Sequence, residues 1–318
     1  MQTYLDFEKP VAELEGKIEE LRHVSDGSGV NIVEEVDRLK AKADRLLRST
    51  YAKLTPWQKA QVARHPERPH FSDVVKAVVE DFTPLAGDRR FAEDVALAGG
   101  LGRVGGRAVM LIGHEKGSDT EGRVRHNFGM ARPEGYRKAM RLMRLAERFG
   151  LPVVSLVDTP GAFPGIDAEE RGQAEAIARC IQTGLSLRVP FVAAIVGEGG
   201  SGGAIALATA DRVIMFEHAI YSVISPEGCA SILWRDGAHA AEAAEALKLT
   251  AQDLQRLGLI DRIVPEPLGG AQRDPAAAAK SLAQAIGAAL AELDGLAPDD
   301  LVARRGEKFL AMGRTGLG

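Results

Sequence analysis

The sequence is poor in cysteine and has no excess of positive charge. Its two cysteines, Cys180 and Cys229, are too few for a closed zinc site with three or four thiolate ligands or for a disulfide-rich secreted scaffold. We expect both thiols to be reduced, with Cys229 a small core residue. Lys and Arg number 40 against 44 Asp and Glu, a net charge of −4. Nonspecific binding to nucleic acid, which needs basic excess, is therefore not expected.

Long apolar runs are also missing. No segment reaches the roughly 18 uninterrupted apolar residues of a membrane span, and the acidic first residues, which include Asp6 and Glu8, do not resemble a signal peptide. We therefore expect a cytoplasmic protein that does not bind membranes. Hydrophobic residues at 45% and charged residues at 26% are ordinary for a globular chain. Glycine is in excess at 35 residues, about 11% against a usual ~7%, which indicates tight turns and close backbone approaches.

Residues 8–80 have a charged, helical pattern. Apolar residues recur every three or four positions in 11–21 and again in 33–46, which predicts two amphipathic helices joined by the polar segment 25–30. Pro56 is expected near the start of a third helix and Ser72 at the N-cap of a fourth. These helices either cover their own domain or form an arm that binds a partner.

From about residue 85 short apolar runs alternate with helical patterns. Gly105 and Gly106 predict a tight turn between the first two strands. The order of the elements predicts an α/β domain with a parallel sheet. The expected strands are 95–98, 108–113, 152–158, 190–197 and 212–216; the expected helices are 133–149, 167–187, 201–210 and 274–293, with further helices after Pro226.

The segment 197–204 (GEGGSGGA) follows an expected strand and opens an expected helix. Such a turn presents backbone N–H groups at the positive end of a helix dipole, where they can bind a negatively charged oxygen. With Glu217 it could be a dinucleotide fingerprint. With Ser201 as nucleophile it could be a hydrolase elbow, although His218 and His239 are the only later histidines and lie close behind. Ser201 is more simply an N-cap.

A third interpretation is an oxyanion hole without a nucleophile. It is favoured by a similar turn at 158–165 (DTPGAFPG), which also lies between a buried strand and a helix. Two strand ends would then offer peptide N–H groups to one site. The alternative is that both glycine-rich loops only turn the chain.

Eight longer segments stand out, at 5–8 (LDFE), 127–130 (NFGM), 133–138 (PEGYRK), 158–165, 170–173 (ERGQ), 197–204, 221–234 (YSVISPEGCASILW) and 265–270 (PEPLGG). Together they resemble the carboxyltransferase α subunits of bacterial acetyl-CoA carboxylases, and the resemblance covers nearly the whole chain. Phe163 departs from the family, in which Tyr is common at this position.

The resemblance implies an α/β fold of crotonase-like type, a superhelix of ββα units with an N-terminal helical extension. It suggests a helical region at 1–84, with a domain start near residue 35 as an alternative, and a carboxyltransferase domain with C-terminal helices at 85–318. It further implies an α2β2 heterotetramer whose β subunit carries a zinc ribbon, with no metal on this chain. The reaction moves a carboxyl group from carboxybiotin to acetyl-CoA and gives malonyl-CoA for fatty acid biosynthesis.

In this family carboxybiotin is borne on a separate biotin carboxyl carrier protein, and a separate biotin carboxylase uses ATP. This chain has no Met-Lys-Met biotinylation site and no P-loop, which fits that division. By resemblance, this chain serves the biotin half of the site, and the β subunit supplies the enolate hole and most contacts to CoA. A preference for propionyl-CoA remains open, because the acyl pocket would lie mostly on the β subunit.

The resemblance also implies roles for residues of the two turns. The biotin ureido oxygen is assigned to backbone amides around Gly199, Gly200, Gly202 and Gly203, with Gly161 and Ala162 as the opposite wall. The biotin vicinity is assigned to Phe163, Pro226, Glu227 and Gly228, although Ser225 and Glu227 could instead form a capping box.

Two other functions stay open. The chain could be a noncatalytic scaffold that binds partners, or a CoA-ester isomerase or hydratase with Glu198 as its acid or base. His114 and Lys116 suggest a polar strand end in the active site, while a lone histidine is more often structural. Lys138 and its neighbours Arg132 and Arg141 could attract CoA phosphates or form a solvated helix face.

Overall fold

One mixed sheet organises the described part of the chain, which in this computed structural model comprises residues 3–28 and 33–314. The strand order is β1-β2-β3-β4-β5-β6-β8, and β7 pairs with β5. Pairing is antiparallel from β1 to β3 and parallel from β3 onward. The strands are β1 (Val79–Pro84), β2 (Leu97–Val104), β3 (Arg107–His114), β4 (Val153–Thr159), β5 (Phe191–Gly200), β6 (Arg212–Phe216), β7 (Ile220–Ser222) and β8 (Arg262–Val264).

The central strands are buried along their length. Every residue of β4 and all of β5 except Gly200 are buried, because parallel strands are covered on both faces. The turn between β2 and β3 contains Gly105 and Gly106, whose φ angles are +56° and +77°, as a two-residue hairpin turn requires. The expected parallel sheet and hairpin are therefore confirmed, but the first strand of the hairpin is Leu97–Val104, so the expected bounds 95–98 are wrong.

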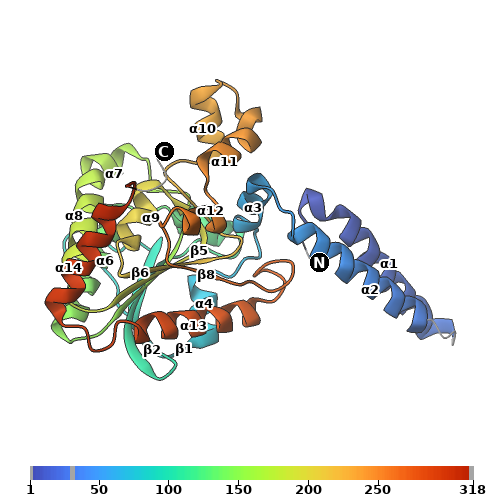
Figure 1. Cartoon of the computed structure of the whole chain (residues 1–318), viewed down its shortest axis with the longest axis horizontal. Coiled ribbons are helices and arrows are strands. Elements are labelled where there is room, and N and C mark those ends of the chain that lie inside the picture. The colour runs from blue at the N-terminus through green and yellow to red at the C-terminus, as the bar shows by residue number, and fades with distance from the viewer. Residues whose placement is uncertain (1–2, 29–32, 315–318) are drawn as a thin grey trace.

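Helices cover both faces of the sheet (Figure 1). On one side α6 (Pro133–Arg148) packs against α8 (Gln173–Ser186), and α9 (Ser201–Ala208) packs against β4 and β5. On the other side α13 (Pro275–Ala291) lies beside α4 (Phe71–Val78). The chain ends with α14 (Pro298–Ala311) against α8.

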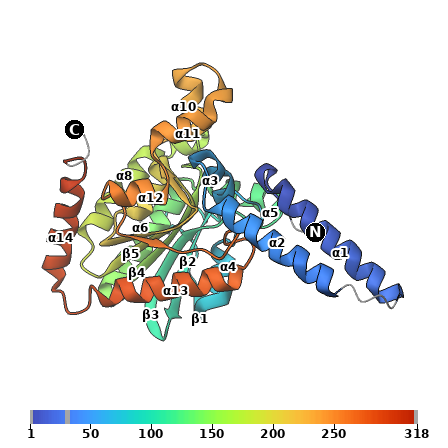
Figure 2. The same ribbon diagram turned by 45° about the vertical axis from the view of Figure 1, so that its right-hand side comes forward.

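The first two helices form a hairpin that projects from the sheet and its helices (Figures 1 and 2). After a short 3-10 turn at Asp6–Glu8, they are α1 (Lys9–Ser28) and α2 (Val33–Tyr51). Both helices were expected, but α1 continues to Ser28, so the loop placed at 25–30 is wrong over its first part. The rest of that loop lies outside the described residues.

The next two helices begin at different kinds of cap. In α3 (Pro56–Ala63) Pro56 is the first helical residue, as expected, and Thr55 is the N-cap. In α4 the N-cap is His70, whose backbone N–H donates to the Asp73 carboxylate at 3.0 Å. Ser72 is therefore inside the helix, and its assignment as N-cap is wrong.

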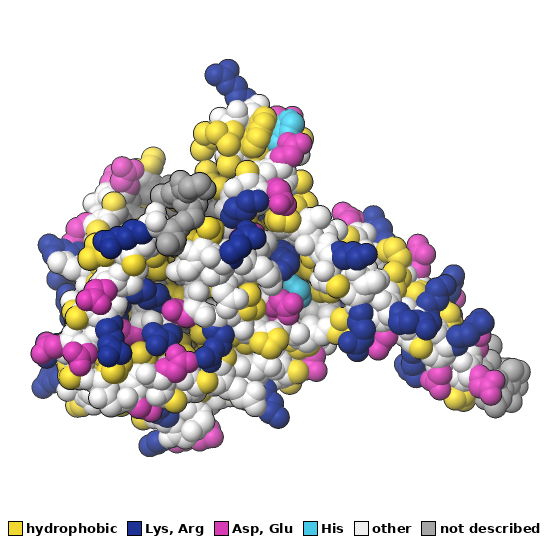
Figure 3. All heavy atoms as spheres, viewed as in Figure 1, with side chains coloured by type: hydrophobic (Ala, Val, Ile, Leu, Met, Phe, Trp, Pro, Cys, Tyr) yellow, Lys and Arg dark blue, Asp and Glu magenta, His cyan; other side chains and the backbone are white. Residues whose placement is uncertain are grey.

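A second projection is built from α10 (Pro226–Leu233), a 3-10 turn at Gly237–His239 and α11 (Ala240–Leu247), before α12 (Ala251–Arg256) returns to the sheet. Hydrophobic side chains gather on this projection (Figure 3). Exposed among them are Ile232, Leu233 and Trp234, and Val223 is exposed just before α10. This surface is apolar enough to suit a protein partner.

The structure corrects several expected boundaries. The helix expected at 167–187 is two helices, α7 (Ile166–Glu170) and α8, because Gly172 adopts the left-handed conformation at φ +82°. Residues 79–84 form strand β1, which pairs antiparallel with β2. The helical pattern was expected to continue to about residue 80, so that limit is wrong by one or two residues. Sequence reasoning missed β1, β7, β8, α14, α5 (Thr120–Arg125) and the 3-10 turn Asn127–Gly129. Within residues 3–28 and 33–314, no helix is long and apolar enough to cross a membrane.

Candidate active site at two glycine-rich strand ends

The glycine-rich segment after residue 197 is the end of a strand rather than a free loop. Gly199 pairs with Thr159 of β4 on one side and with Tyr221 of β7 on the other. A Cβ atom at Gly199 would lie 2.8 Å from the Tyr221 ring. This close packing explains why Gly199 carries no side chain, and the pairing with β7 continues β5 to Gly200.

The first turn of α9 lacks a side-chain cap. Its N-cap is Gly200, which has no side chain that could accept a hydrogen bond. The N–H groups of a first helical turn have no acceptor inside the helix, and they lie at the positive end of its dipole. Gly202 and Gly203 occupy this turn, so their amides are suited to an anionic oxygen. Ser201 begins the helix at φ +49°, so its assignment as N-cap is wrong.

The two glycine-rich turns lie directly against each other. A Cβ atom at Gly200 would lie 2.2 Å from the Pro160 carbonyl oxygen. One at Gly203 would lie 2.8 Å from the carbonyl carbon of Gly161 and 3.0 Å from the nitrogen of Ala162. The structure thus brings together the two segments that the sequence indicated, and the contact leaves no room for side chains at Gly200 and Gly203.

The opposing loop is held by its own hydrogen bonds. The Thr159 hydroxyl donates to the Gly161 carbonyl oxygen at 2.6 Å, and the Gly161 N–H donates back to the same hydroxyl oxygen at 3.1 Å. The Phe163 N–H donates to the Ala131 carbonyl oxygen at 3.0 Å. The Gly161 amide is therefore already engaged, in contrast to the first-turn amides of α9.

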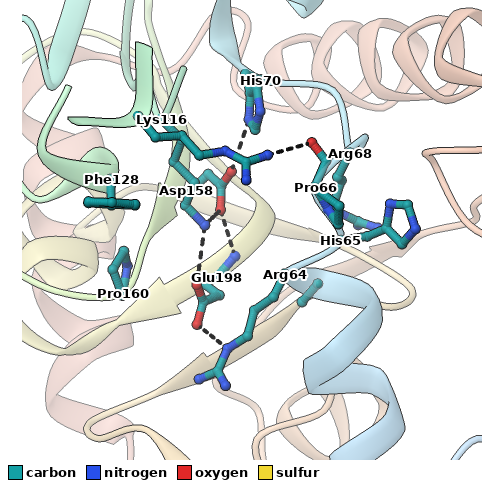
Figure 4. A pocket seen from close by; sticks show the side chains of 12 residues that line it. Arg64, His65, Pro66, Arg68, His70, Lys116, Phe128, Asp158, Pro160 and Glu198 are labelled. Carbon is teal, nitrogen blue, oxygen red and sulfur yellow. Dashed lines mark hydrogen bonds and ion pairs between the residues drawn. The ribbon is translucent and has the colours of Figure 1, made fainter. Parts of the chain in front are cut away.

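A charged cavity of about 280 Å³ adjoins the two strand ends. Lys116 donates to Asp158 at 2.6 Å and to Glu198 at 3.2 Å, and the Arg64 Nε donates to Glu198 at 2.6 Å. The Glu198 backbone N–H donates to Asp158 at 2.9 Å. In Figure 4 the two carboxylates lie at the centre, with Arg64 joined to Glu198 and His70 to Asp158. Two buried anions and two cations thus balance each other beside the glycine turns.

These ion pairs shift the pKa values of the charged side chains in the cluster. Burial alone would raise the pKa of Asp158, but Lys116 beside it and further hydrogen bonds hold that pKa well below its usual range. Burial would lower the pKa of Lys116, and the charges of Asp158 and Glu198 reverse this and raise it. Both groups are therefore charged at neutral pH, because each stabilises the ionised form of the other.

His114 lies behind this cluster. Burial lowers its pKa to about 4, so the ring is neutral at pH 7, and its Nδ1 accepts the Asp158 N–H at 3.4 Å. His114 is therefore a buried structural histidine, while Lys116, two residues later, lines the cavity.

The beginning of α10 is connected to the same cluster. The Arg64 Nη1 donates to Glu227 at 2.5 Å, so one guanidinium joins Glu198 and Glu227. Ser225 is the N-cap of α10 and accepts the Gly228 N–H at 3.1 Å, and Pro226 is the first helical residue. The cap is confirmed for Ser225, but the N3 residue that a capping box requires is Gly228, so Glu227 is not part of one and its carboxylate pairs with Arg64 instead.

Phe163 and the basic residues of α6 take different positions. The Arg132 guanidinium lies 4.2 Å from the centre of the Phe163 ring and pairs with Asp167. Lys138 is buried, pairs with Glu93 and donates to the Asp94 carbonyl oxygen at 2.8 Å. Lys138 therefore belongs neither to a solvated helix face nor to an exposed phosphate site.

Sequence reasoning did not single out the residues that follow α3. The segment 64–70 (RHPERPH) supplies Arg64 and His70 to the cavity. It also supplies Arg68, which forms a fully buried pair with Glu266 at 2.6 Å and donates to the Val196 carbonyl oxygen at 2.7 Å. The sequence feature that could have identified this segment is its composition, with four basic residues and two prolines within seven positions. The pair also explains the role of Glu266 in the segment 265–270.

No group of three or more His, Cys, Asp or Glu side chains that could hold a metal ion occurs within the described ranges.

The chain is closely similar to curated proteins over its whole length. A family model described as "Acetyl co-enzyme A carboxylase carboxyltransferase-like" matches residues 4–313. A protein of Paramagnetospirillum magneticum named acetyl-coenzyme A carboxylase carboxyl transferase subunit alpha is 67% identical over 98% of this chain and 99% of its own length. A protein of the same name from Rhizorhabdus wittichii is 68% identical over 98% of this chain and 100% of its own length.

Solved structures share the fold at low sequence identity. Transcarboxylase 12S aligns with TM-score 0.55 and 21% identity over 68% of this chain, which spans 42% of that longer chain. The β subunit of geranyl-CoA carboxylase from P. aeruginosa aligns with TM-score 0.56 and 18% identity over 80% of this chain and 45% of its own. The expected crotonase-like fold is thereby confirmed. With a matching family model over nearly all residues and relatives above 60% identity, the chain belongs to the acetyl-coenzyme A carboxylase carboxyltransferase-like family.

Proposed function

We propose that this chain is the α subunit of an acetyl-CoA carboxylase carboxyltransferase. Together with a β subunit it transfers the carboxyl group of carboxybiotin to acetyl-CoA and forms malonyl-CoA for fatty acid biosynthesis. Full-length relatives at 63–68% identity that carry this name support the proposal. The structural observation behind it is the contact between Gly203 and residues 161–162, which sets the uncapped first turn of α9 against a second strand end.

The chemistry asks for hydrogen-bond donors rather than for a nucleophile. Carboxybiotin supplies the carboxyl group, and negative charge develops on its ureido oxygen as that group leaves. The amides of Gly202 and Gly203, with those around Gly199 and Gly200, are suited to donate to this oxygen because they are fixed before the reaction and need no reorganisation. One such donor contributes roughly 3 kcal/mol to stabilisation of the transition state. Gly161 and Ala162 form the opposite wall.

The charged cluster orients this turn. Asp158 accepts the Glu198 N–H, directly before Gly199. The two oxygens of Glu198 accept hydrogen bonds from Arg64 and Lys116. Since both oxygens are occupied by cationic donors, Glu198 is poorly placed to act as the acid or base of a hydratase or isomerase. The arrangement favours carboxyl transfer over those reactions.

The proposal also covers the partners of this chain and the roles of further residues. The partners are the β subunit in an α2β2 heterotetramer, the biotin carboxyl carrier protein and an ATP-using biotin carboxylase, in the cytoplasm and without a metal on this chain. The exposed apolar side chains at residue 223 and residues 232–234 support a role for the α10–α11 projection in binding a partner. Phe163, Pro226, Glu227 and Gly228 are proposed to lie near biotin, and residues 85–318 to form the carboxyltransferase domain behind the helical region 1–84.

The test is malonyl-CoA formation from acetyl-CoA and the carboxylated carrier protein. The chain alone, its cognate β subunit alone and their mixture are compared, with assembly of the mixture verified by light scattering. We expect activity only in the mixture. Activity of this chain alone would show that it holds a complete active site. An assembled but inactive mixture would favour the scaffold, and faster transfer to propionyl-CoA would correct the substrate.

A further inference from the structure

A second cavity, of about 500 Å³, is lined mainly by arginines. It shares no lining residue with the charged cavity at the strand ends. The side chains come from the loop before β2, from α6 and from α8. Six guanidinium groups line it: Arg89, Arg90, Arg137, Arg141, Arg144 and Arg179. Because the whole chain has a net charge of −4, this gathering does not follow from a basic composition.

The two acidic residues of the cavity do little to neutralise these arginines. One oxygen of Asp88 accepts the backbone N–H groups of residues 90, 91 and 92 at 2.9, 2.8 and 3.1 Å. Asp88 therefore shapes the loop that presents Arg89 and Arg90. The other acid, Glu175, pairs with Arg179 at 3.3 Å. Among the acids that line the cavity, Asp88 alone is left for the other five arginines, and Glu93 acts on Arg141 from outside the lining.

Where these arginines form hydrogen bonds, the acceptors are neutral. Arg137 donates to the Arg171 carbonyl oxygen at 2.6 Å, and Arg141 donates to the carbonyl oxygens of residues 86 and 87 at 3.0 Å each. These bonds orient the guanidinium groups but bring no negative charge to them. Burial and the nearby charge of Arg89 lower the pKa of Arg141 and outweigh the opposing charges of Glu93 and Asp88.

Three of the six arginines are exposed and are not engaged by other side chains of the described residues. Within residues 3–28 and 33–314, no side-chain hydrogen bond or ion pair engages Arg89, Arg90 or Arg144, and all three are exposed. Arg89 also lies at φ +63°, a conformation that costs a non-glycine residue free energy. The Nε of Arg137 is buried without a partner. Repulsion, backbone strain and an unpaired donor are costs that an anion in the cavity would offset.

We propose that this cavity binds a compact oligophosphate group, of the kind carried by nucleoside di- and triphosphates and by the diphosphate of CoA. Guanidinium groups match phosphate oxygens with paired N–H donors, and several of them suit a group with two or more negative charges. The site is separate from the proposed biotin site. It adds an anion-binding site to this chain that takes no part in binding biotin.

The test is a calorimetric titration of the chain assembled with its cognate β subunit, using inorganic triphosphate without magnesium. The variant Arg89→Gln/Arg144→Gln removes two uncommitted charges, and Arg38→Gln/Arg45→Gln removes two exposed charges from the projecting helix α2. We expect the dissociation constant to rise at least tenfold in the first variant and to change less than twofold in the second. We also expect the first variant to unfold at the same or a higher temperature, because repulsion among the arginines is relieved.

Competition then identifies the source of the phosphate group. Displacement of triphosphate by saturating CoA assigns the cavity to the diphosphate of CoA, whereas retained binding assigns it to a free nucleotide. The proposal is overturned if triphosphate does not bind the wild-type assembly, or if both variants lose affinity equally. It is also overturned if triphosphate binds the isolated chain but not the assembly, since the cavity would then be covered by the β subunit.

Discussion

Gly203 and Ala162 lie so close that a methyl group on Gly203 would come within 3.0 Å of the Ala162 nitrogen. The neighbouring Gly202 differs, because a methyl group there would meet only the Ile177 side chain at 3.6 Å, an ordinary contact. We expect Gly203→Ala to push the two strand ends apart and to lower the transfer rate about 100-fold or more.

Gly202→Ala is the matched control, since it adds the same methyl group one residue earlier without a backbone clash. Its rate should stay within about a few-fold of the wild type. Steady-state kinetics of both assembled variants with the carboxylated carrier protein measure the difference. Equal rates for the two variants would contradict the assignment of the contact to the active site.

The two carboxylates that Lys116 bridges predict a large effect of removing its charge. Lys116→Met leaves Asp158 and Glu198 with less compensation in a buried setting, and breaking such a pair costs about 3–5 kcal/mol of unfolding free energy. The pKa of Asp158 is lowered in the fold, so its stabilising contribution is present above pH ~4 and is lost as the pH falls. The difference between variant and wild type should therefore shrink in acid.

Chemical denaturation at pH 7 and at pH 3 measures this difference. The control is Lys248→Met, which breaks an exposed pair with Glu245 and should cost less than about 1 kcal/mol. A loss for Lys116→Met that is no larger than the loss for this control would contradict the buried pairing.

His114 predicts a pH dependence of stability. Its pKa is about 4 in the fold against ~6.5 in an unfolded chain. Only the unfolded state takes up a proton between these values, so the stabilising contribution is complete above pH ~6.5 and is lost as the pH falls toward 4. The loss amounts to up to about 3 kcal/mol.

His114→Asn removes this titration and keeps an acceptor for the Asp158 N–H. Burial also lowers the pKa of His65 and of His218, so the wild-type slope will not vanish in the variant. We expect the unfolding free energy of the variant to fall less steeply between pH 6.5 and 4.5. Parallel profiles of the two proteins would contradict the neutral, buried state of His114.

Two ion pairs involving α14 should differ widely in their contribution. Arg305 is fully buried, pairs with Asp211 at 2.7 Å and donates to carbonyl oxygens that include those of Gly184 and Leu187. Arg305→Met leaves Asp211 buried and unpaired, so we expect a loss of about 3–5 kcal/mol. Arg188→Met breaks an exposed pair with Asp299 and should cost less than about 1 kcal/mol. Urea titration of both variants tests this contrast.

Much of the sheet could be predicted, because its apolar runs are uninterrupted. Strand β6 was predicted at its observed bounds, and the turn at Gly105 and Gly106 follows directly from their freedom at positive φ. Short elements such as β7 and β8 could not be predicted, since three residues carry no periodicity. The break at Gly172 was missed because the flanking residues keep a helical pattern on both sides.

The candidate site divides in a similar way. The glycines of both strand ends stand out by composition. Both loops lie between a buried strand and a helix, and this similarity predicted that they contribute to one site. Arg64 could not be assigned by itself, because its partners Glu198 and Glu227 lie 134 and 163 residues away in the chain. Ser201 was misassigned as a cap since its sequence position suits one, while its backbone is left-handed.

The family, the parallel sheet and the two glycine-rich turns follow from the amino-acid sequence, because they depend on local patterns and on long motif strings. The fold was needed to show which glycines tolerate no side chain, which charges compensate one another, and which arginines of the second cavity have no acidic partner. These properties depend on distances between segments far apart in the chain. The close contact of Gly203 with residues 161–162 and the gathering of arginines between α6 and the loop before β2 arise only when the chain is folded.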